Sequence, residues 1–146
     1  MIFVKLLRCY LVKMKLIIYT DGGARGNPGP AGVGVVFRNE TGKIISKYKK
    51  YIGKATNNAA EYQALILALM EAGRLKADQL LINMDSELIV RQMQGKYKIK
   101  EPALKVLAGE VLKLTNKFRH VEFKHISREQ NKEADRLVNL AIDGQS

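Results

Sequence analysis

Three β-rich runs separated by short turns open the chain, and they restrict its fold more than any other feature. The runs lie at residues 15–20 (KLIIYT), 32–38 (GVGVVFR) and 43–52, with turn-forming residues at 21–31 and 40–42 between them. Runs of this kind, bounded by Gly, Pro, Asn and Asp, are typical of strands. Because short turns join antiparallel neighbours, we expect a three-stranded antiparallel meander.

The hydrophobic pattern becomes helical after residue 57. Residues 58–71 (NAAEYQALILALME) are apolar nearly all round, which predicts a buried helix, and Gly73 is placed to end it. Residues 79–84 (QLLINM) form a continuous apolar run, as expected of a buried parallel strand. The remaining segments are expected to be a helix at 86–94, a helix at 102–118, a strand at 120–126 and a helix at 129–142.

This order predicts one α/β domain over residues 14–146. Its sheet would be mixed and five-stranded, antiparallel in strands 1–3 and parallel in strands 4 and 5, with helices on both faces. Residues 1–13 are basic and apolar and precede a second methionine, Met14, so we interpret them as an N-terminal extension dispensable to the fold. Lys5 and Arg8 interrupt the apolar part and a cleavage site is missing, which disfavours a signal peptide.

Four acids occupy positions that such a sheet brings together. Asp21 follows the first strand, Asp85 follows the fourth, Glu61 lies in the first turn of the buried helix, and Asp135 lies in the last helix. Each acid also has a purely structural alternative. Asp21 could belong to an Asp-Gly turn, and Asp85 could be the N-cap of the helix that follows it. Glu61 could close a capping box with Asn58, and Asp135 could be a solvated helix residue. Clustered carboxylates repel one another unless cations neutralise them, and such hard oxygen ligands select Mg²⁺ or Mn²⁺.

Four sequence blocks carry a resemblance to a known family. YTDGGARGNPGPAGVG, TNNAAEYQAL, MDSELIV and HISREQNKEADRLVNLA resemble, in order and spacing, the motifs of type 1 ribonuclease H, over residues 14–141. The resemblance implies a three-layer ribonuclease H-like fold. It also implies that Asp21, Glu61, Asp85 and Asp135 bind two Mg²⁺ ions, with Mn²⁺ as a substitute, and that Asp21 bridges them. The implied reaction is hydrolysis of the RNA strand of RNA/DNA hybrids to 5′-phosphate and 3′-hydroxyl ends.

The same resemblance implies further site residues. His125 and Arg128 are alternatives for an auxiliary catalytic group, because His125 has the family's spacing to Asp135 but shares a strand face with apolar residues, whereas a cation such as Arg128 suits phosphoryl transfer. Short amides and backbone N–H groups can read the 2′-hydroxyl that distinguishes RNA from DNA. The residues expected to bind substrate are Gly22, Gly23, Asn27, Thr56, Asn57, Asn58 and Ser86.

The charge favours a nucleic-acid partner. The chain has 25 Lys and Arg residues against 14 acids, a formal net charge of +11, and its lysines cluster at 43–54 and 96–100. Many bacterial family members carry a long basic protrusion rich in tryptophan, but this chain has no Trp and only GKYKIK at that position, so it resembles a compact form. Hybrid affinity would then rest on the two lysine clusters.

The cysteine content and hydropathy indicate the cellular compartment. Cys9 is the only cysteine, which excludes an internal disulfide and fits a reducing, cytoplasmic compartment, and no apolar run is long enough to span a membrane.

The remaining expectations concern partners and rival functions. We expect a monomer without an obligate protein partner. Double-stranded RNA stays open as a second substrate. A non-catalytic binding domain would have no reason to keep mutually repelling acids, and a DNA-directed integrase-like nuclease would need extra domains for which the chain has no room.

Overall fold

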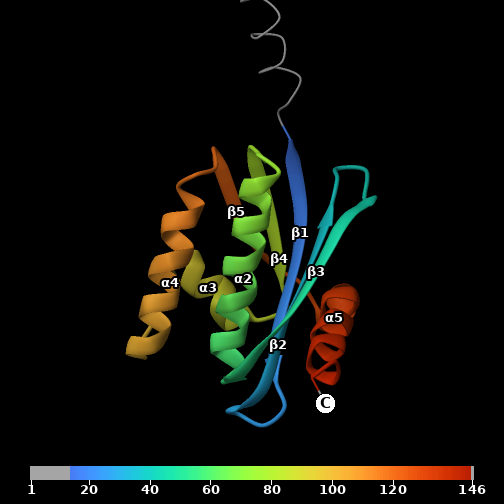
Figure 1. Cartoon of the computed structure of the whole chain (residues 1–146). Helices are drawn as coiled ribbons and strands as arrows, with labels where there is room; N and C mark the ends of the chain where they lie inside the picture. The colour runs from blue at the N-terminus through green and yellow to red at the C-terminus, as the bar shows by residue number, and fades with distance from the viewer. Residues whose placement is uncertain (1–13, 146) are drawn as a thin grey trace, which may run out of the picture.

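A computed structural model describes residues 14–145; the expected extension at 1–13 lies outside the described residues. The five strands form one sheet in the order β3-β2-β1-β4-β5, antiparallel among β1, β2 and β3 and parallel for β4 and β5, as predicted (Figure 1). The elements are β1 Lys15–Ala24, β2 Gly29–Arg38, β3 Ile44–Ala55, α2 Asn57–Arg74, β4 Gln79–Met84, α3 Glu87–Met93, α4 Pro102–Thr115, β5 His120–His125, the 3-10 helix η1 Arg128–Asn131 and α5 Lys132–Asp143.

The first two strands are longer than their hydrophobic runs. β1 continues through the Asp-Gly-Gly segment to Ala24, and β2 begins at Gly29, so only residues 25–28 form the connecting turn. The expectation that Asp21 ends a strand at an Asp-Gly turn is therefore wrong. Pairing along the full length, with Asp21 opposite Gly34 and Ala24 opposite Ala31, overrides the local turn preference of these residues.

The larger core lies between the sheet and helices α2 and α4. Leu16 and Ile18 of β1 and Leu65 of α2 are fully buried there, and the near-complete burial of one long face of α2 explains its apolar sequence. The helix runs past Gly73 to Arg74, so Gly73 does not end it; Leu75 is the C-cap residue. On this side α4 ends at Thr115, three residues before the expected Phe118.

Helix α5 covers the opposite face of the sheet, which confirms the prediction of helices on both faces (Figure 1). Its Ala134 and Leu137 pack with Val36 in a second, smaller core. The helix lies directly on β2 because Gly34 has no side chain: a Cβ there would stand 2.8 Å from Leu137 Cβ and would overlap the Ala134 carbonyl. This close approach brings the N-terminal half of α5, with Asp135, over the strand that pairs with Asp21.

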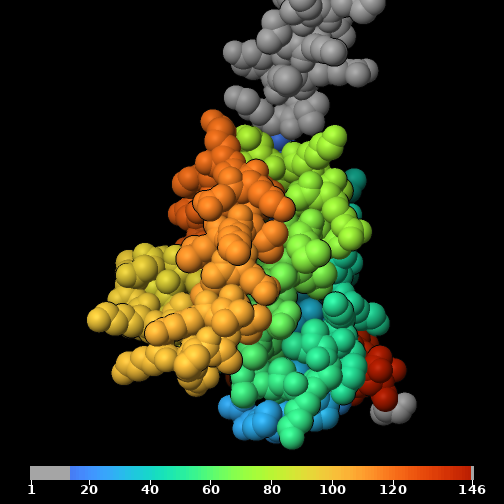
Figure 2. Space-filling view, turned by 60° about the vertical axis from the view of Figure 1, so that its left-hand side comes forward, coloured from blue at the N-terminus to red at the C-terminus, as the bar shows by residue number. Residues whose placement is uncertain are grey.

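Only a short loop separates α3 from α4, and it contains GKYKIK. Lys96, Lys98 and Lys100 are all exposed in it. In Figure 2 the segment around residues 85–101 (yellow to gold) stands out from the molecule beside α4 (orange). Among residues 14–145, no helix is both long and apolar enough to cross a bilayer.

Candidate active site

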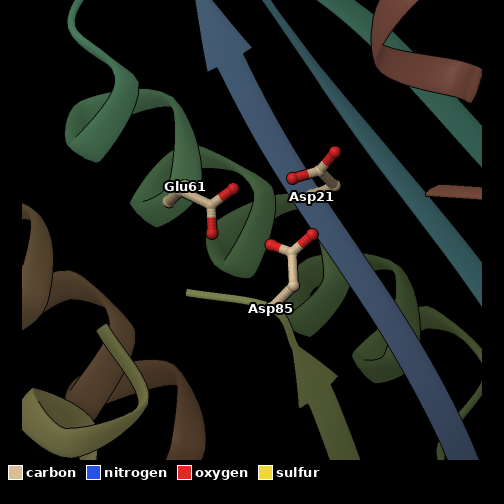
Figure 3. Close-up of side chains that lie close together, drawn as sticks. All are labelled: Asp21, Glu61 and Asp85. Atoms are coloured by element: carbon tan, nitrogen blue, oxygen red, sulfur yellow. The ribbon is translucent and has the colours of Figure 1, made fainter. Parts of the chain in front are cut away.

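Three acids from separate elements meet beside β1, near the C-terminal end of β4. Asp21 lies within β1, Glu61 in the second turn of α2 and Asp85 just after β4, and one carboxylate oxygen of each lies within 4.8 Å of the other two. Their carboxyl groups point toward one another (Figure 3). Asp21 is 7% exposed and Glu61 5% exposed, so this is a buried cluster of like charges rather than a solvated acidic surface.

Glycine at position 22 allows α2 to approach the strand that carries Asp21. A Cβ on Gly22 would overlap the carbonyl group of Ala60 and stand 2.6 Å from the Glu61 nitrogen. The contact also orients the acid, because the Gly22 N–H donates to Glu61 Oε1 at 2.7 Å. Glu61 therefore does not close a capping box with Asn58; Thr56 caps α2 by accepting from the Ala59 N–H at 3.1 Å.

Asp85 is likewise free of a capping role. Ser86 is the N-cap of α3, and its Oγ accepts from the Ile89 N–H at 3.3 Å. Asp85 is half-buried and turns toward Asp21 and Glu61. Both acids that the sequence also allowed as helix caps thus point into the site, while a neighbouring Thr or Ser caps the helix.

Burial and mutual repulsion raise the pKa of all three acids and so disfavour three negative charges at the site. Burial raises the pKa of Asp21, and the carboxylates of Glu61, Asp85 and Asp135 raise it further. Burial also raises the pKa of Glu61, partly offset by contact with the Asp21 carboxyl and by the Gly22 N–H. The pKa of Asp85 is raised by burial too. A divalent cation would reverse these shifts by replacing the bound protons.

An open pocket of about 410 Å³ surrounds the acids. Asp135 lines it from α5 and contacts the Asp21 carboxyl, so all four predicted acids share one pocket. Arg128 lines it from η1, and its charge lowers the pKa of Asp85 against the effect of burial. The predicted substrate-binding residues that line the pocket are Gly22, Gly23, Asn57, Asn58 and Ser86.

Asn27 and Thr56 lie beside the lining residues and hold them in place. Asn27 Oδ1 accepts from the Asn57 N–H at 3.0 Å, and Asn57 Oδ1 accepts from the Ala24 N–H at 2.8 Å. These bonds join the turn at 25–28 to the start of α2. Thr56 acts here as the N-cap of that helix.

His125 has a different environment from Arg128. It is the last residue of β5, it is exposed, and it is not among the residues that line the pocket. Although His125 shares a strand face with apolar residues, its side chain is therefore not packed into the core with them. The choice between His125 and Arg128 as the auxiliary group stays a prediction, with Arg128 the one that the fold places beside the acids.

Two features of the site were not predicted from the sequence. Arg25 donates to Asp143 Oδ1 at 2.6 Å and to Asn139 Oδ1 at 3.2 Å, which ties the turn at 25–28 to α5. Asn131 is 1% exposed, and its amide contacts both β1 and Asp85. A local pattern does not indicate either contact, because each joins residues more than 40 positions apart.

A protein-family model described as Reverse transcriptase-like matches residues 19–141, a range that includes all four acids. LC11-RNase H1, isolated from compost, is 50% identical and superposes with a TM-score of 0.86 over 89% of this chain and 98% of that one. The chain belongs to the ribonuclease H family. The absence of a long insertion between α3 and α4 makes it a compact ribonuclease H domain, as the sequence predicted.

Two further proteins of the family are similar over most of this chain. Bifunctional protein Rv2228c of Mycobacterium tuberculosis is 44% identical over 131 residues, which are 89% of this chain but 36% of that protein. Ribonuclease HI of Halobacterium salinarum is 39% identical over 86% of this chain and 63% of that protein. The structure of the Halobacterium RNase H1 superposes with a TM-score of 0.87. The chain thus spans less than two thirds of either relative's length.

Proposed function

We propose that the chain is a metal-dependent endoribonuclease that hydrolyses the RNA strand of RNA/DNA hybrids and leaves 5′-phosphate and 3′-hydroxyl ends. The observation that carries the proposal is the buried cluster of Asp21, Glu61 and Asp85, with Asp135 in the same pocket. A fold gains no stability from holding two buried acids and a half-buried one together, so the cluster favours a positively charged ligand. Family membership and the hybrid bound to LC11-RNase H1 support this substrate class.

The donor set fits hard divalent cations. Glu61 Oε2 is buried and has no hydrogen-bond partner among the described residues, while Oε1 is held by the Gly22 N–H, so one oxygen is fixed and the other could bind a cation. Carboxylate oxygens are the ligands that Mg²⁺ and Mn²⁺ take in proteins. Asp21, Glu61, Asp85 and Asp135 would hold two such ions.

When bound, the cations supply an activated water and stabilise the leaving oxygen of an in-line phosphodiester displacement. The chain's own residues orient and distinguish the substrate. Asn57 and Asn58, at the start of α2, present amide groups at the pocket wall, where a 2′-hydroxyl can both donate and accept. Arg128 would contact a phosphate next to the acids, where a fixed cation offsets the negative charge of the phosphodiester. The full set proposed to bind substrate is Gly22, Gly23, Asn27, Thr56, Asn57, Asn58 and Ser86.

Exposed lysines would supply affinity that does not depend on sequence. The lysines of the α3–α4 loop are exposed to solvent, and the exposed lysines of β3 lie on the edge strand of the sheet. Each phosphate neutralised by a lysine releases counterions, so hybrid binding should weaken steeply as salt rises. A monomer in the cytoplasm is the setting that this proposal assumes.

The test uses labelled RNA/DNA, RNA/RNA and DNA/DNA duplexes with Mg²⁺, Mn²⁺ or EDTA. We expect RNA-strand cleavage of the hybrid with either metal, none in EDTA, and none with Asp21→Asn. Glu110→Gln, an exposed acid on α4, is the matched control and should cleave like the wild type. Absence of metal-dependent RNA cleavage in every duplex would refute the proposal, and equal cleavage of RNA/RNA would extend the substrate class to double-stranded RNA.

A further inference from the structure

Asn131 stands where η1 meets α5, and its side chain does not do what its position suggests. It is the N-cap residue of α5, and Asn is among the most favourable residues there, because its oxygen can accept from the free N–H groups of the first turn. In this structure it makes no capping hydrogen bond. The side chain enters the interior instead, where the residue is 1% exposed. Because η1 leads directly into α5 and Ser127 caps η1 with a capping box, the Asn131 side chain is not required as a cap and can make buried contacts instead.

Those contacts lie on β1, which carries Asp21, and on Asp85, which directly follows β4. Asn131 Nδ2 donates to the Thr20 carbonyl oxygen at 2.8 Å, one residue before Asp21. The paired register of β1 and β4 ends at Tyr19 and Asn83, so this bond holds β1 just beyond the last strand pair. The same amide also contacts the Asp85 carboxyl group.

The orientation of the Asn131 amide follows from its neighbours. If nitrogen and oxygen were exchanged, the side-chain oxygen would face the Thr20 carbonyl oxygen at 2.8 Å and the Asp85 carboxylate, and both contacts would be repulsive. The NH₂ group therefore faces the acids. Oδ1 is buried without a hydrogen-bond partner among the described residues, so the carbonyl end does not account for the residue's placement.

We infer that Asn131 is a positioning residue that holds Asp85 and the start of α5 against β1, so that Asp85 and Asp135 are fixed relative to Asp21 before a cation binds. Asp135 lies one helical turn after Asn131, so one side chain joins the elements that carry three of the four acids. The inference rests on the proposed function, since it concerns the affinity of the same acids for divalent cations. Groups that orient metal ligands typically change metal affinity by about 10- to 100-fold when they are removed.

A purely structural role is the alternative, and the chain contains a matched case. Asn83 is 4% exposed, and its Nδ2 donates to the Ile18 carbonyl at 3.1 Å, on the same strand and two residues earlier than Thr20. Asn83 is not among the groups that influence the acids. Removal of either amide should lower the unfolding temperature, but only removal of Asn131 should weaken cation binding.

The experiment compares Asn131→Ala, Asn83→Ala and the wild type by calorimetric titration with MgCl₂ and with MnCl₂, after thermal unfolding in EDTA has shown that each is folded. We expect Asn131→Ala to bind either cation about tenfold or more weakly than the wild type. The cation affinity of Asn83→Ala should stay within about twofold of the wild type, because the Asn83 side chain is not expected to contact the ligands. In cleavage assays, a high Mg²⁺ concentration should restore most of the activity of Asn131→Ala, because the ligands are intact. A folded Asn131→Ala protein with wild-type cation affinity would overturn the inference.

A measurement on the unaltered protein covers the case in which Asn131→Ala does not fold. The side-chain NH₂ signals of Asn131 and Asn83 are followed by ¹⁵N NMR as MgCl₂ is added. We expect the Asn131 signals to shift with the occupancy of the site and the Asn83 signals to stay in place; unmoved Asn131 signals at saturation would refute the inference. If the wild type binds no cation at all, the proposed function itself fails, which separates the two outcomes.

Discussion

The contact between Gly22 and α2 gives a sharp prediction for stability. In Gly22→Ala, the new methyl group would overlap the Ala60 carbonyl group and stand 2.6 Å from the Glu61 nitrogen. These are backbone atoms of a buried helix, so they cannot rotate away as a side chain does. Overpacking of this kind costs about 1–3 kcal/mol. Displacement of α2 would also break the 2.7 Å bond from the Gly22 N–H to Glu61 and leave a buried group unsatisfied, for about 1–3 kcal/mol more.

We therefore expect Gly22→Ala to lower the free energy of unfolding by about 2–6 kcal/mol. At about 3 °C for each kcal/mol in a domain of this size, the melting temperature should fall by about 6–18 °C. Urea unfolding measures the free energy and thermal unfolding measures the melting temperature, both followed by circular dichroism in EDTA so that bound metal makes no contribution.

Gly23→Ala is the matched control. A Cβ at Gly23 would lie 3.7 Å from Val138 Cγ1, an ordinary contact, on the same strand and one residue away. Its stability should stay within about 1 kcal/mol of the wild type, because alanine is no worse than glycine inside a strand. The reasoning fails if Gly22→Ala loses less than about 1 kcal/mol, or if the two variants lose equal amounts.

Three further predictions concern charge, capping and catalysis. Burial and the neighbouring acids raise the folded-state pKa of Asp21, so the metal-free protein should lose stability as pH rises above about 4, where the unfolded chain ionises. Asp21→Asn should flatten this dependence in urea titrations from pH 4 to 9; a steeper slope would contradict the assignment. Thr56→Ala removes the cap to the Ala59 N–H and should cost about 1 kcal/mol in urea unfolding, whereas Thr56→Ser should cost little. Arg128→Ala should lower kcat on a labelled hybrid by about 10-fold or more, as loss of a charge-assisted hydrogen bond predicts, and His125→Ala should change it less; the reverse ranking would favour His125.

Periodicity was sufficient to predict the order and direction of the strands. The runs that form β1, β4 and α2 differ in hydrophobic period, and that difference reflects how many of their faces are buried. The extents of β1 and β2 were missed because Asp, Gly and Asn are turn formers by local preference. The paired segment also lies under α5, which can approach β2 closely because Gly34 has no side chain. Such a contact between distant segments leaves no local pattern.

The helix N-termini show why the site was predicted only in part. The sequence allowed Asn58 as a capping-box partner and Asp85 as a capping residue, since short polar residues before a helix usually cap it. The structure places Asn58 and Asp85 on the pocket wall and gives the capping to Thr56 and Ser86. Asn131 lies at its cap position but bonds elsewhere. Composition identifies a polar residue near a helix start, whereas only packing decides which backbone or carboxyl group it meets.

The four acids come from β1, α2, the end of β4 and α5, and this distribution affects synthesis as well as catalysis. A ribosome delivers Asp21 more than a hundred residues before Asp135, and β1 cannot pair with β4 until residue 83 has left the exit tunnel. A nascent chain therefore carries an incomplete set of acids until its last helix docks on the sheet. If the proposed function holds, cleavage activity in a translation reaction should appear only after α5 has left the exit tunnel, which makes it a sensitive reporter of complete folding.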